Sequence, residues 1–506
     1  MASPLTIRNL TSTAIILKSL ERFDDPNTKQ SKASAFPSAQ RNATSIAPSA
    51  GELGLHAQTF KRQGIDVTLA PYESYTLRSP SPDGSSAGSP STLSSTTLRI
   101  TVENETGERY RIDSNPSYTQ KGSQLFTPLT PNPSSSYTAL YHPIKPASHL
   151  TIHSNHLPDY SKWMQSLPDT LPLSALSIPG THNSHTHYRA LPSVRCQTVD
   201  VRTQLDNGVR FLDIRVQPAH ATDVSKKDLY LVHGAFPISL TGTKYLAPVL
   251  EACYAFLDAN PSETVLISLK REGIGSATDE HLAAILRQHY IGPNAGKWHT
   301  DDKIPYLGDI RGKLVLVRRY EMRSEDARHG LDATAWPNNS AHALHGPFCV
   351  QDYCEIMHPS VIPDKLLHAN AQLVRAAATT SFVPGVNTDV ANPVPPGPIH
   401  LNFLSGSNFF RVGTWPEKIA RIVNRGVEEW VCAGHHLQEP LTSPQEPGMT
   451  SLGEAGVRRV GEGDGGAGVV VMDMVGDGGD WDLVRLVVGL NMGILRKVQE
   501  AGMVGQ

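Results

Sequence analysis

The spacing of apolar and polar positions changes near residue 150 and divides the chain into two regions. The first region has short β-type runs separated by turn residues, and the runs 96–105 and 108–114 flank Thr106 and Gly107 as the two arms of a hairpin would. We therefore predict a small β-rich N-terminal domain over residues 1–148.

Two polar stretches, at about 24–51 and 79–97, interrupt this β-rich region. Both are too poor in apolar side chains to offset the entropy lost on ordering, so we predict disordered insertions. A third stretch, at about 437–468, is rich in Gly, Glu and Pro without periodicity and predicts a mobile insertion in the second region.

Beyond residue 148, apolar runs of strand length alternate with helical patterns, which is typical of a parallel sheet with crossover helices. The predicted strands are 173–178, 209–216, 229–233, 264–269, 313–320, 400–404 and 468–475. The predicted helices are 198–208, 247–261, 278–290, 415–431 and 481–499. This pattern predicts an α/β domain over residues 149–506, built as a barrel or as a doubly wound sheet.

Composition narrows the class of protein without naming a function. The 506 residues are 39 % apolar and 18 % charged with a net charge of -3, which indicates a globular protein of two or three units. The small net charge excludes a strong general attraction to nucleic acid. Five cysteines without a CxxC pair and the lack of a long apolar segment favour a cytoplasmic protein that has no transmembrane span.

Polar residues of catalytic type stand at the downstream ends of the predicted strands, which is the edge where α/β barrels build their sites. Asp213 and Arg215 are two apart on one strand and therefore share a face. The other candidates follow or end their own strands: His182 with Asn183, His233, Lys270, Arg319 and Asp473.

Two histidines, two carboxylates and three cations at one edge suit cleavage of a phosphodiester. One imidazole can take the proton of the attacking hydroxyl while the other protonates the leaving oxygen. The cations can neutralise charge that grows on the phosphate oxygens. Asp473 lies in an apolar run, where a histidine N–H would be a natural partner for its carboxylate.

The ordered motifs resemble one known family. The set IPGTHNS, QLDNGVRFLDIRV, LYLVHG, NPSETVLISLKRE and RGKLVLVRRY is similar to the X domain of phosphatidylinositol-specific phospholipase C in its bacterial and fungal single-domain form. The resemblance runs from about residue 150 to the C-terminus and does not cover the β-rich region. It implies an imperfect (β/α)8 barrel of the TIM type that cleaves phosphatidylinositol to diacylglycerol and inositol cyclic phosphate.

The resemblance also implies a role for each candidate residue. His182 matches the general base for the inositol 2-hydroxyl with Asp473 as its orienting carboxylate, and His233 matches the general acid. Asp213 and Arg215 match the pair beside the phosphate. The residues that match inositol-binding positions are Lys270, Arg319 and Asp352, with Tyr353 next to the position where bacterial enzymes stack a tyrosine on the ring.

The choice between metal-dependent and metal-independent catalysis turns on Arg215. Calcium-dependent relatives carry an acidic residue at this place and metal-independent relatives carry arginine, so the resemblance implies no metal and no cofactor. Asn183 departs from the bacterial pattern, which has Asp there, and matches the calcium-dependent pattern. Calcium therefore remains the alternative, and turnover is expected to be reduced.

Two other interpretations of function stay open. The chain could be a catalytically weak protein that binds lipid headgroups, which Asn183 suggests, or a phosphodiesterase for another glycerophospholipid, which the displaced tyrosine permits. Phe409, Phe410 and Trp415 are candidates for peripheral contact with a membrane surface, although they could equally pack on the following helix. A metal cluster of His182, His185 and His187 is disfavoured by their spacing, and the partner of the N-terminal domain cannot be inferred.

Overall fold

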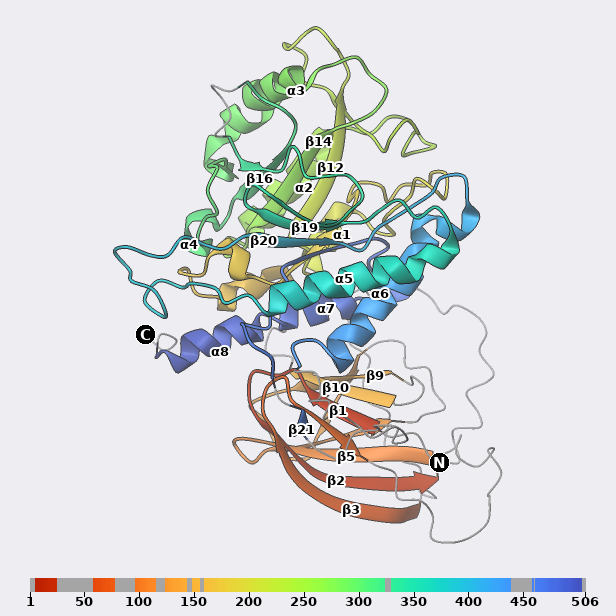
Figure 1. The fold of residues 1–506 in the computed structure, drawn as a ribbon, viewed down its shortest axis with the longest axis vertical. Helices are drawn as coiled ribbons and strands as arrows, with labels where there is room; N and C mark the ends of the chain where they lie inside the picture. Colours follow the sequence, from red (N-terminus) through yellow and green to blue (C-terminus); the bar gives the residue numbers. More distant parts are fainter. Residues whose placement is uncertain are drawn as a thin grey trace, which may run out of the picture. The chain divides into compact units, whose positions relative to one another are not determined.

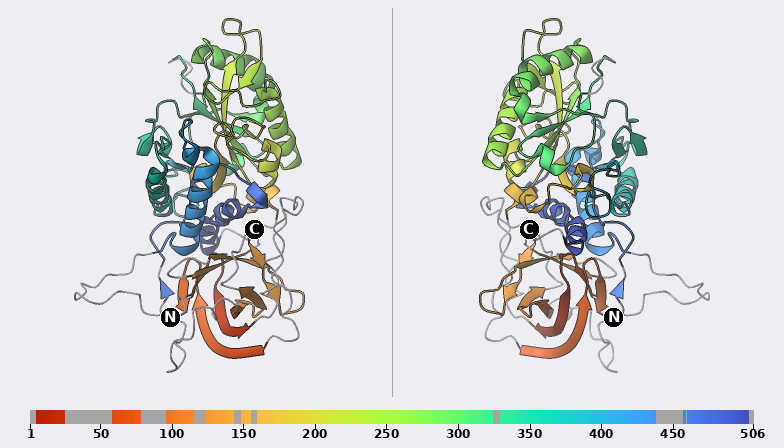
Figure 2. Two further views of the ribbon diagram at one scale, coloured as in Figure 1. Left: turned by 90° about the vertical axis from the view of Figure 1, so that its right-hand side faces the viewer. Right: turned by 90° about the vertical axis from the view of Figure 1, so that its left-hand side faces the viewer.

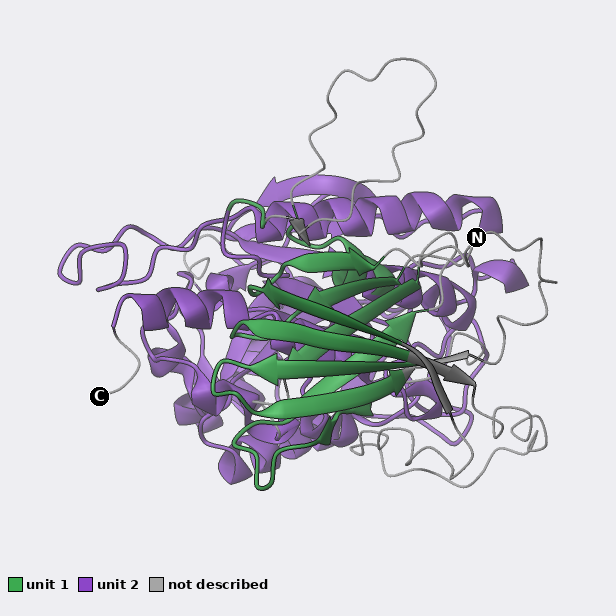
Figure 3. Cartoon of the chain, turned by 90° about the horizontal axis from the view of Figure 1, so that it is seen from below, with its two compact units in different colours: residues 1–156, 429–462 green, residues 157–428, 463–506 purple. Residues whose placement is uncertain are grey.

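The computed structural model describes most of the chain. The described ranges are 5–24, 58–77, 96–114, 123–142, 148–154, 159–323, 329–437, 457–458 and 460–502. Most of each predicted insertion, at about 24–51, 79–97 and 437–468, lies outside them. The chain forms two compact units, residues 1–156 with 429–462 and residues 157–428 with 463–506 (Figure 3).

The first unit consists of two β-sheets. Its strands are β1 (Leu5–Asn9), β2 (Ile15–Asp24), β3 (Gln58–Leu69), β4 (Ser74–Leu77), β5 (Thr96–Asn104), β6 (Arg109–Ser114), β7 (Gln124–Leu125), β8 (Thr127–Pro128), β9 (Tyr137–His142), β10 (Ser148–Ser154) and β21 (Val457–Arg458). One sheet has the order β21-β4-β1-β10-β9-β7 and the other the order β3-β2-β5-β6-β8.

Alternation of side chains along the strands forms the core of this unit. Ile100 and Val102 on β5, together with Ile15 and Leu17 on β2, are buried in one apolar cluster. The predicted hairpin is present, because β5 pairs antiparallel with β6. Its turn uses Gly107, whose φ of 81° is in the left-handed region that glycine adopts without strain.

The second unit is built on one large curled sheet (Figure 1). Its strands are β11 (Ile178–Thr181), β12 (Phe211–Pro218), β13 (Leu229–Leu231), β14 (Val265–Arg271), β15 (Trp298–His299), β16 (Leu314–Arg319), β17 (Leu331–Asp332), β18 (Ser340–His345), β19 (Phe348–Asp352), β20 (Ile399–Phe403) and β22 (Val469–Met472). The order is β15-β16-β14-β12-β11-β22-β20-β19-β18, with β13 beside β12 and β17 beside β16.

The last strand of this sheet pairs with the first, as in a barrel. β22 lies parallel to β11, and β12, β14 and β16 continue the parallel run on the other side of β11. Among the described residues no pairing joins β16 or β17 to β18 or β19, so the sheet is curled but not closed. The α/β class is therefore confirmed, whereas a complete (β/α)8 barrel is not seen.

Helices surround the curled sheet (Figures 1 and 2). They are α1 (Val201–Asp206), α2 (Leu246–Ala259), α3 (Asp279–Ile285), α4 (Leu307–Ile310), α5 (Ile362–Ala377), α6 (Pro416–Ala433), α7 (Asp482–Gly489) and α8 (Met492–Glu500). Leu250 of α2 and Ile285 of α3 join Leu212 and Ile214 of β12 in one buried cluster. No helix in the described ranges is both long enough and apolar enough to span a bilayer.

Two predicted elements are wrong in part. Residues 173–178 were expected to be one strand, but Leu173–Ala175 is a 3-10 turn and the strand begins at Ile178. The turn lets Leu173 and Leu176, three apart, both enter the core, which a straight strand would not allow. The predicted strand at 229–233 exists as β13 but runs antiparallel to β12.

A predicted helix is broken, and several elements of this unit were not predicted. The helix expected at 481–499 divides into α7 and α8 at Asn491, whose side chain accepts from the Ser177 backbone N–H and donates to the Ser177 carbonyl. β19 and α5 were not predicted. β19 was missed because its run is short and carries Cys349 and Gln351, so it lacks the pattern of a buried strand.

Candidate functional site

His182 and Asp473 form the centre of a charged cluster at the carboxyl ends of the curled strands. His182 follows β11 and Asp473 follows β22, and these strands are neighbours although 291 residues separate the two side chains. His182 Nδ1 lies 2.9 Å from Asp473 Oδ1, and Asp473 is 1 % exposed. The predicted pairing of Asp473 with a histidine is thus observed.

The backbone around this pair is held by Gln197. Its buried amide donates to the carbonyls of His182 (2.8 Å) and Met472 (2.9 Å), and the His182 N–H donates to the same Met472 carbonyl. Gln197 was not predicted, because it lies in a loop without any recognisable motif. Its role is to keep the ends of β11 and β22 in register.

Two donors meet the other ring nitrogen of His182. Arg215 Nη2 lies 2.9 Å and Asn183 Nδ2 lies 3.2 Å from Nε2, so Nε2 accepts and the ring carries its proton on Nδ1 toward Asp473. Burial opposes protonation, while the charges of Asp473 and Cys196 raise the pKa of His182 and make the ring more basic. The N–H groups of Arg215 and Asn183 both point at Nε2, so a proton on Nε2 would be repelled by both. These two donors therefore keep Nε2 unprotonated in the absence of a ligand. The ring is thus a strong base held unprotonated at Nε2.

Asp213 is the anion beneath the cationic side chains. It is fully buried, and it accepts from the Asn183 N–H (3.3 Å), from Arg215 (3.4 Å) and from Arg319 (3.2 Å). Burial opposes its ionisation, but Arg215 and Arg319 hold the pKa of Asp213 well below its usual range. As predicted, Asp213 and Arg215 share a face, and Ile214 between them points into the apolar cluster.

Glu272 is a charged member of the cluster that sequence reasoning missed. Its carboxylate accepts from Arg215 Nη1 at 2.9 Å and from the Gly234 N–H at 2.6 Å. Burial opposes its ionisation, but Arg215, Lys270 and the Gly234 N–H lower the pKa of Glu272 to about 2. Its position two residues after Lys270 was the available signal, since alternate residues of an extended segment share a side.

His233 lies opposite His182. The two ring centroids are 6.2 Å apart, and His233 Nδ1 lies 2.8 Å from the Val194 carbonyl, to which it donates. Burial opposes protonation of this ring, yet the neighbouring Cys196 raises the pKa of His233. A ring that favours its charged form is suited to donate a proton.

The remaining cations line the same edge. Lys270 is 3.9 Å from Glu272 and its side chain is 34 % exposed, so it is the most accessible cation of this cluster. The Arg319 guanidinium lies 4.2 Å from the ring centre of Trp336, whose indole N–H donates to Asp352 at 3.3 Å. Asp352 therefore reaches the cluster through Trp336, a residue that the sequence did not single out.

Two predicted features are not joined to this cluster. The Tyr353 ring packs against His368 of α5 with centroids 4.9 Å apart, and no described contact brings it to the histidines. His185 Nε2 donates to the Val232 carbonyl and His187 packs against Tyr188, so the disfavoured histidine metal cluster is not assembled.

The residues present do not fit a calcium ion at the predicted alternative site. Calcium needs several oxygen ligands, but the Asp213 carboxylate is already engaged by Arg215 and Arg319. A different combination, His182, Cys196 and Asp473, brings one nitrogen, one sulfur and one oxygen within 4.8 Å of one another. Such mixed donors favour a softer ion than calcium.

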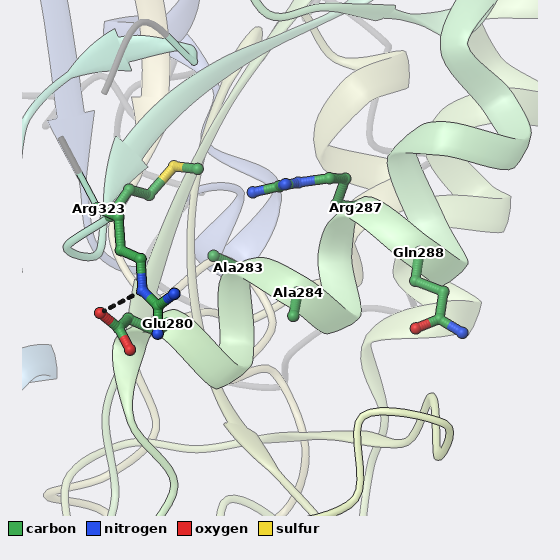
Figure 4. Close-up of a pocket in the computed structure, with 7 residues that line it drawn as sticks. Glu280, Ala283, Ala284, Arg287, Gln288 and Arg323 are labelled. Carbon is green, nitrogen blue, oxygen red and sulfur yellow. Dashed lines mark hydrogen bonds and ion pairs between the residues drawn. The ribbon is translucent and has the colours of Figure 1, made fainter. Parts of the chain in front are cut away.

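A surface hollow lies away from these residues. It is lined by Glu280 and Ala283 of α3 and by Arg287 and Arg323 outside that helix, and Arg323 pairs there with Glu280 (Figure 4). None of the residues that line it belongs to the charged cluster around His182 and Asp473. Chemistry therefore places the candidate site at the strand ends and not in this hollow.

Known proteins resemble this chain in the region that holds most of the candidate site. Residues 170–320 match the family model "Phosphatidylinositol-specific phospholipase C, X domain". A 1-phosphatidylinositol phosphodiesterase of Listeria monocytogenes is 34 % identical over 166 residues, which are 31 % of this chain and 48 % of the relative. The human PI-PLC X domain-containing protein 1 is 28 % identical over 204 residues, 33 % of this chain and 58 % of the relative. The chain thus spans about half the length of these relatives.

Two solved structures are also similar to this chain, at lower identity. Phosphatidylinositol-specific phospholipase C from Listeria monocytogenes is 22 % identical with a TM-score of 0.44, covering 65 % of this chain and 98 % of the other. An enzyme of the same name from Staphylococcus aureus is 20 % identical with a TM-score of 0.48, covering 66 % of this chain and 98 % of the other. The predicted resemblance is confirmed by the family model, which matches residues 170–320.

Proposed function

We propose that this protein, whose residues 170–320 match that X domain, is a phosphodiesterase that cleaves phosphatidylinositol-type lipids without a metal cofactor. The observation that carries the proposal is the placement of His182 and His233 with ring centroids 6.2 Å apart beside Arg215. Two imidazoles of opposite protonation facing one space, with a guanidinium between strand ends, suit a phosphate diester.

The proposed reaction begins at His182. Its Nε2 takes the proton of the inositol 2-hydroxyl while Asp473 stabilises the charge that forms on the ring. The 2-oxygen attacks phosphorus, and the bond from phosphorus to the diacylglycerol oxygen breaks. His233 donates its proton to that leaving oxygen, which yields diacylglycerol and inositol cyclic phosphate.

The cations stabilise the negative charge of the transition state. Arg215 is already oriented by Glu272 and Asp213, so it can turn one N–H from His182 to a phosphate oxygen at little cost of reorganisation. That movement also releases Nε2 to act as the base. Lys270 and Arg319 are proposed to bind inositol hydroxyls, with Asp352 as an acceptor beside Trp336.

An exposed aromatic cluster favours a substrate that is part of a lipid surface. Phe236, three residues after His233, stacks on Phe409 with centroids 4.0 Å apart, and Phe409 contacts Phe410, which is 91 % exposed. Aromatic side chains of this kind insert at the boundary between headgroups and acyl chains. We expect Phe410→Ser to weaken binding to phosphatidylinositol vesicles while cleavage of a short-chain soluble substrate stays the same.

The direct test follows the product. The purified full chain is incubated with phosphatidylinositol vesicles and a chelator, and cyclic inositol phosphate is measured by phosphorus NMR. We expect product from the wild type and from His187→Ala, a histidine of the same loop outside the cluster, and none from His182→Ala. Vesicle binding without product, with or without calcium, would favour the headgroup-binding alternative. A panel of other glycerophospholipids tests the altered position of Tyr353.

A further inference from the structure

Cys196 lies against both histidines of the proposed site, and the mechanism does not use it. It is fully buried, and its Sγ is 3.9 Å from His233 Nδ1 and 3.8 Å from Asn183 Nδ2. Its carbonyl accepts from the Met474 N–H at 2.7 Å, and its N–H donates to Thr186. The sulfur is therefore held in a defined place beside the strand ends.

Three ligand atoms of different chemistry converge here. Those of His182, Cys196 and Asp473 lie within 4.8 Å of one another, and in the described part of the chain no other group of His, Cys, Asp and Glu is this close. Nitrogen, sulfur and oxygen are the donors that zinc takes in proteins, in a tetrahedral arrangement that leaves a fourth position open when the protein supplies three.

Unpartnered polar atoms at the same place give an independent indication of a ligand. Asp473 Oδ2 has no hydrogen-bond partner although the residue is only 1 % exposed, and Asn183 Oδ1 is likewise unpartnered in a fully buried residue. Leaving such atoms unpaired costs free energy, and a bound group would remove that cost.

We propose that a thiophilic divalent cation, with zinc as the natural case, binds to His182, Cys196 and Asp473 and inhibits the protein. The site is distinct from an oxygen-rich calcium site, because it depends on the thiolate. The inhibition rests on the proposed function, since the ion would occupy the base and its orienting carboxylate, whereas binding itself does not.

Charge and protons balance in this step. The ion displaces the thiol proton of Cys196 to water, and where it binds His182 Nδ1 the ring proton moves to Nε2 as Arg215 turns away, so the imidazole stays neutral. Two anionic ligands then neutralise the two charges of the ion.

Neighbouring cations limit the affinity. Arg215 is 2.9 Å from His182 Nε2, and the protonated form of His233 would lie next to the sulfur. Both repel a cation, so the ion is expected to bind reversibly and to leave with a chelator. This distinguishes the site from closed structural zinc sites, which have four protein ligands.

Cobalt provides a readout that does not depend on catalysis. The full chain, kept reduced with a phosphine, is titrated with cobalt(II), and we expect a thiolate-to-cobalt charge-transfer band that saturates at one ion per chain. In Cys196→Ala the charge-transfer band is expected to be lost. The affinity of this variant for zinc should be lower than that of the wild type by on the order of 100-fold. Cys253→Ala, another buried thiol within the α2 cluster, is the matched control and should keep the band.

A second variant and an activity assay complete the test. Asp473→Asn is expected to keep the charge-transfer band but to bind cobalt more weakly, because one anionic ligand is lost. If the proposed phosphodiesterase is active, zinc should inhibit it and a chelator should restore it. No charge-transfer band, or a band that persists in Cys196→Ala, would overturn the metal site. A band from a protein that cleaves no lipid would instead reject the proposed function and leave the site standing.

Discussion

The two halves of the curled sheet present very different strand ends. On the side of β11, β12, β14 and β22, the charged residues of the cluster are tied to one another, as in the contacts of Arg215 with His182, Asp213 and Glu272. On the side of β19, Asp352 has one bond from Trp336, and Tyr353 packs against α5. The charged groups of the first side are fixed by contacts with one another, whereas fewer such contacts fix the second side.

The largest effect on kcat is expected from changing Asp473, the carboxylate that orients His182 on the first side. Asp473→Asn would place an amide N–H toward His182 Nδ1 and favour the tautomer with its proton on Nε2, which cannot act as a base. We expect kcat to fall by about 10³- to 10⁴-fold with little change in KM. Asp477→Asn, an exposed residue shortly after it, is the control. A loss below tenfold would show that the ring needs no orienting carboxylate.

Removing the central guanidinium should rank next. Arg215→Gln takes away the donor to phosphate and the partner of Glu272, and we expect kcat to fall by about 10²- to 10³-fold. Steady-state kinetics on phosphatidylinositol in mixed micelles measures this. Arg202→Gln, which breaks an exposed pair on α1, should leave kcat unchanged. Calcium-dependent recovery of Arg215→Gln would indicate that the guanidinium replaces a metal.

Acid should lower the free energy of unfolding, because Glu272 on the first side becomes protonated. Because its pKa in the folded protein is lowered to about 2, the carboxylate stabilises the fold at pH values above its unfolded pKa, and this contribution is lost as the pH falls from about 5 toward 2. Its size is on the order of 2 kcal/mol. Urea unfolding at a series of pH values should show the wild type losing its advantage over Glu272→Gln in that window. The exposed Glu251→Gln on α2 should show no such change.

The smallest effect is expected on the second side. Asp352→Asn keeps the acceptor for Trp336 but removes a charge near the proposed inositol position, so KM should rise by about 3- to 10-fold with kcat nearly constant. Glu355→Gln in the same loop is the exposed control. A fall in kcat as large as that of Arg215→Gln would contradict the division of the sheet into two sides.

Much of the architecture could be predicted, because the signals are local. Apolar runs and helical periods located β12, β14, β16, α2 and α6 with small errors at their ends. The break between α7 and α8 could not be predicted, since it depends on the contact of Asn491 with Ser177, 314 residues away. The missed β19 carries polar side chains that bond in part to neighbours distant in sequence, such as the Gln351 amide that donates to Asn402.

The site divides in the same way. The sequence by itself determined that Asp213 and Arg215 share a face and that His182 and His233 stand after strands, because the two-residue period and the strand ends are properties of short segments. The family resemblance predicted that Asp473 orients His182, and the tertiary structure brings the two to 2.9 Å. Only the tertiary structure decided that Cys196 lies against both histidines and that Tyr353 turns to α5. Those contacts arise because the last strand pairs with the first and because loops are positioned by the elements they cross, and neither is written in a local pattern.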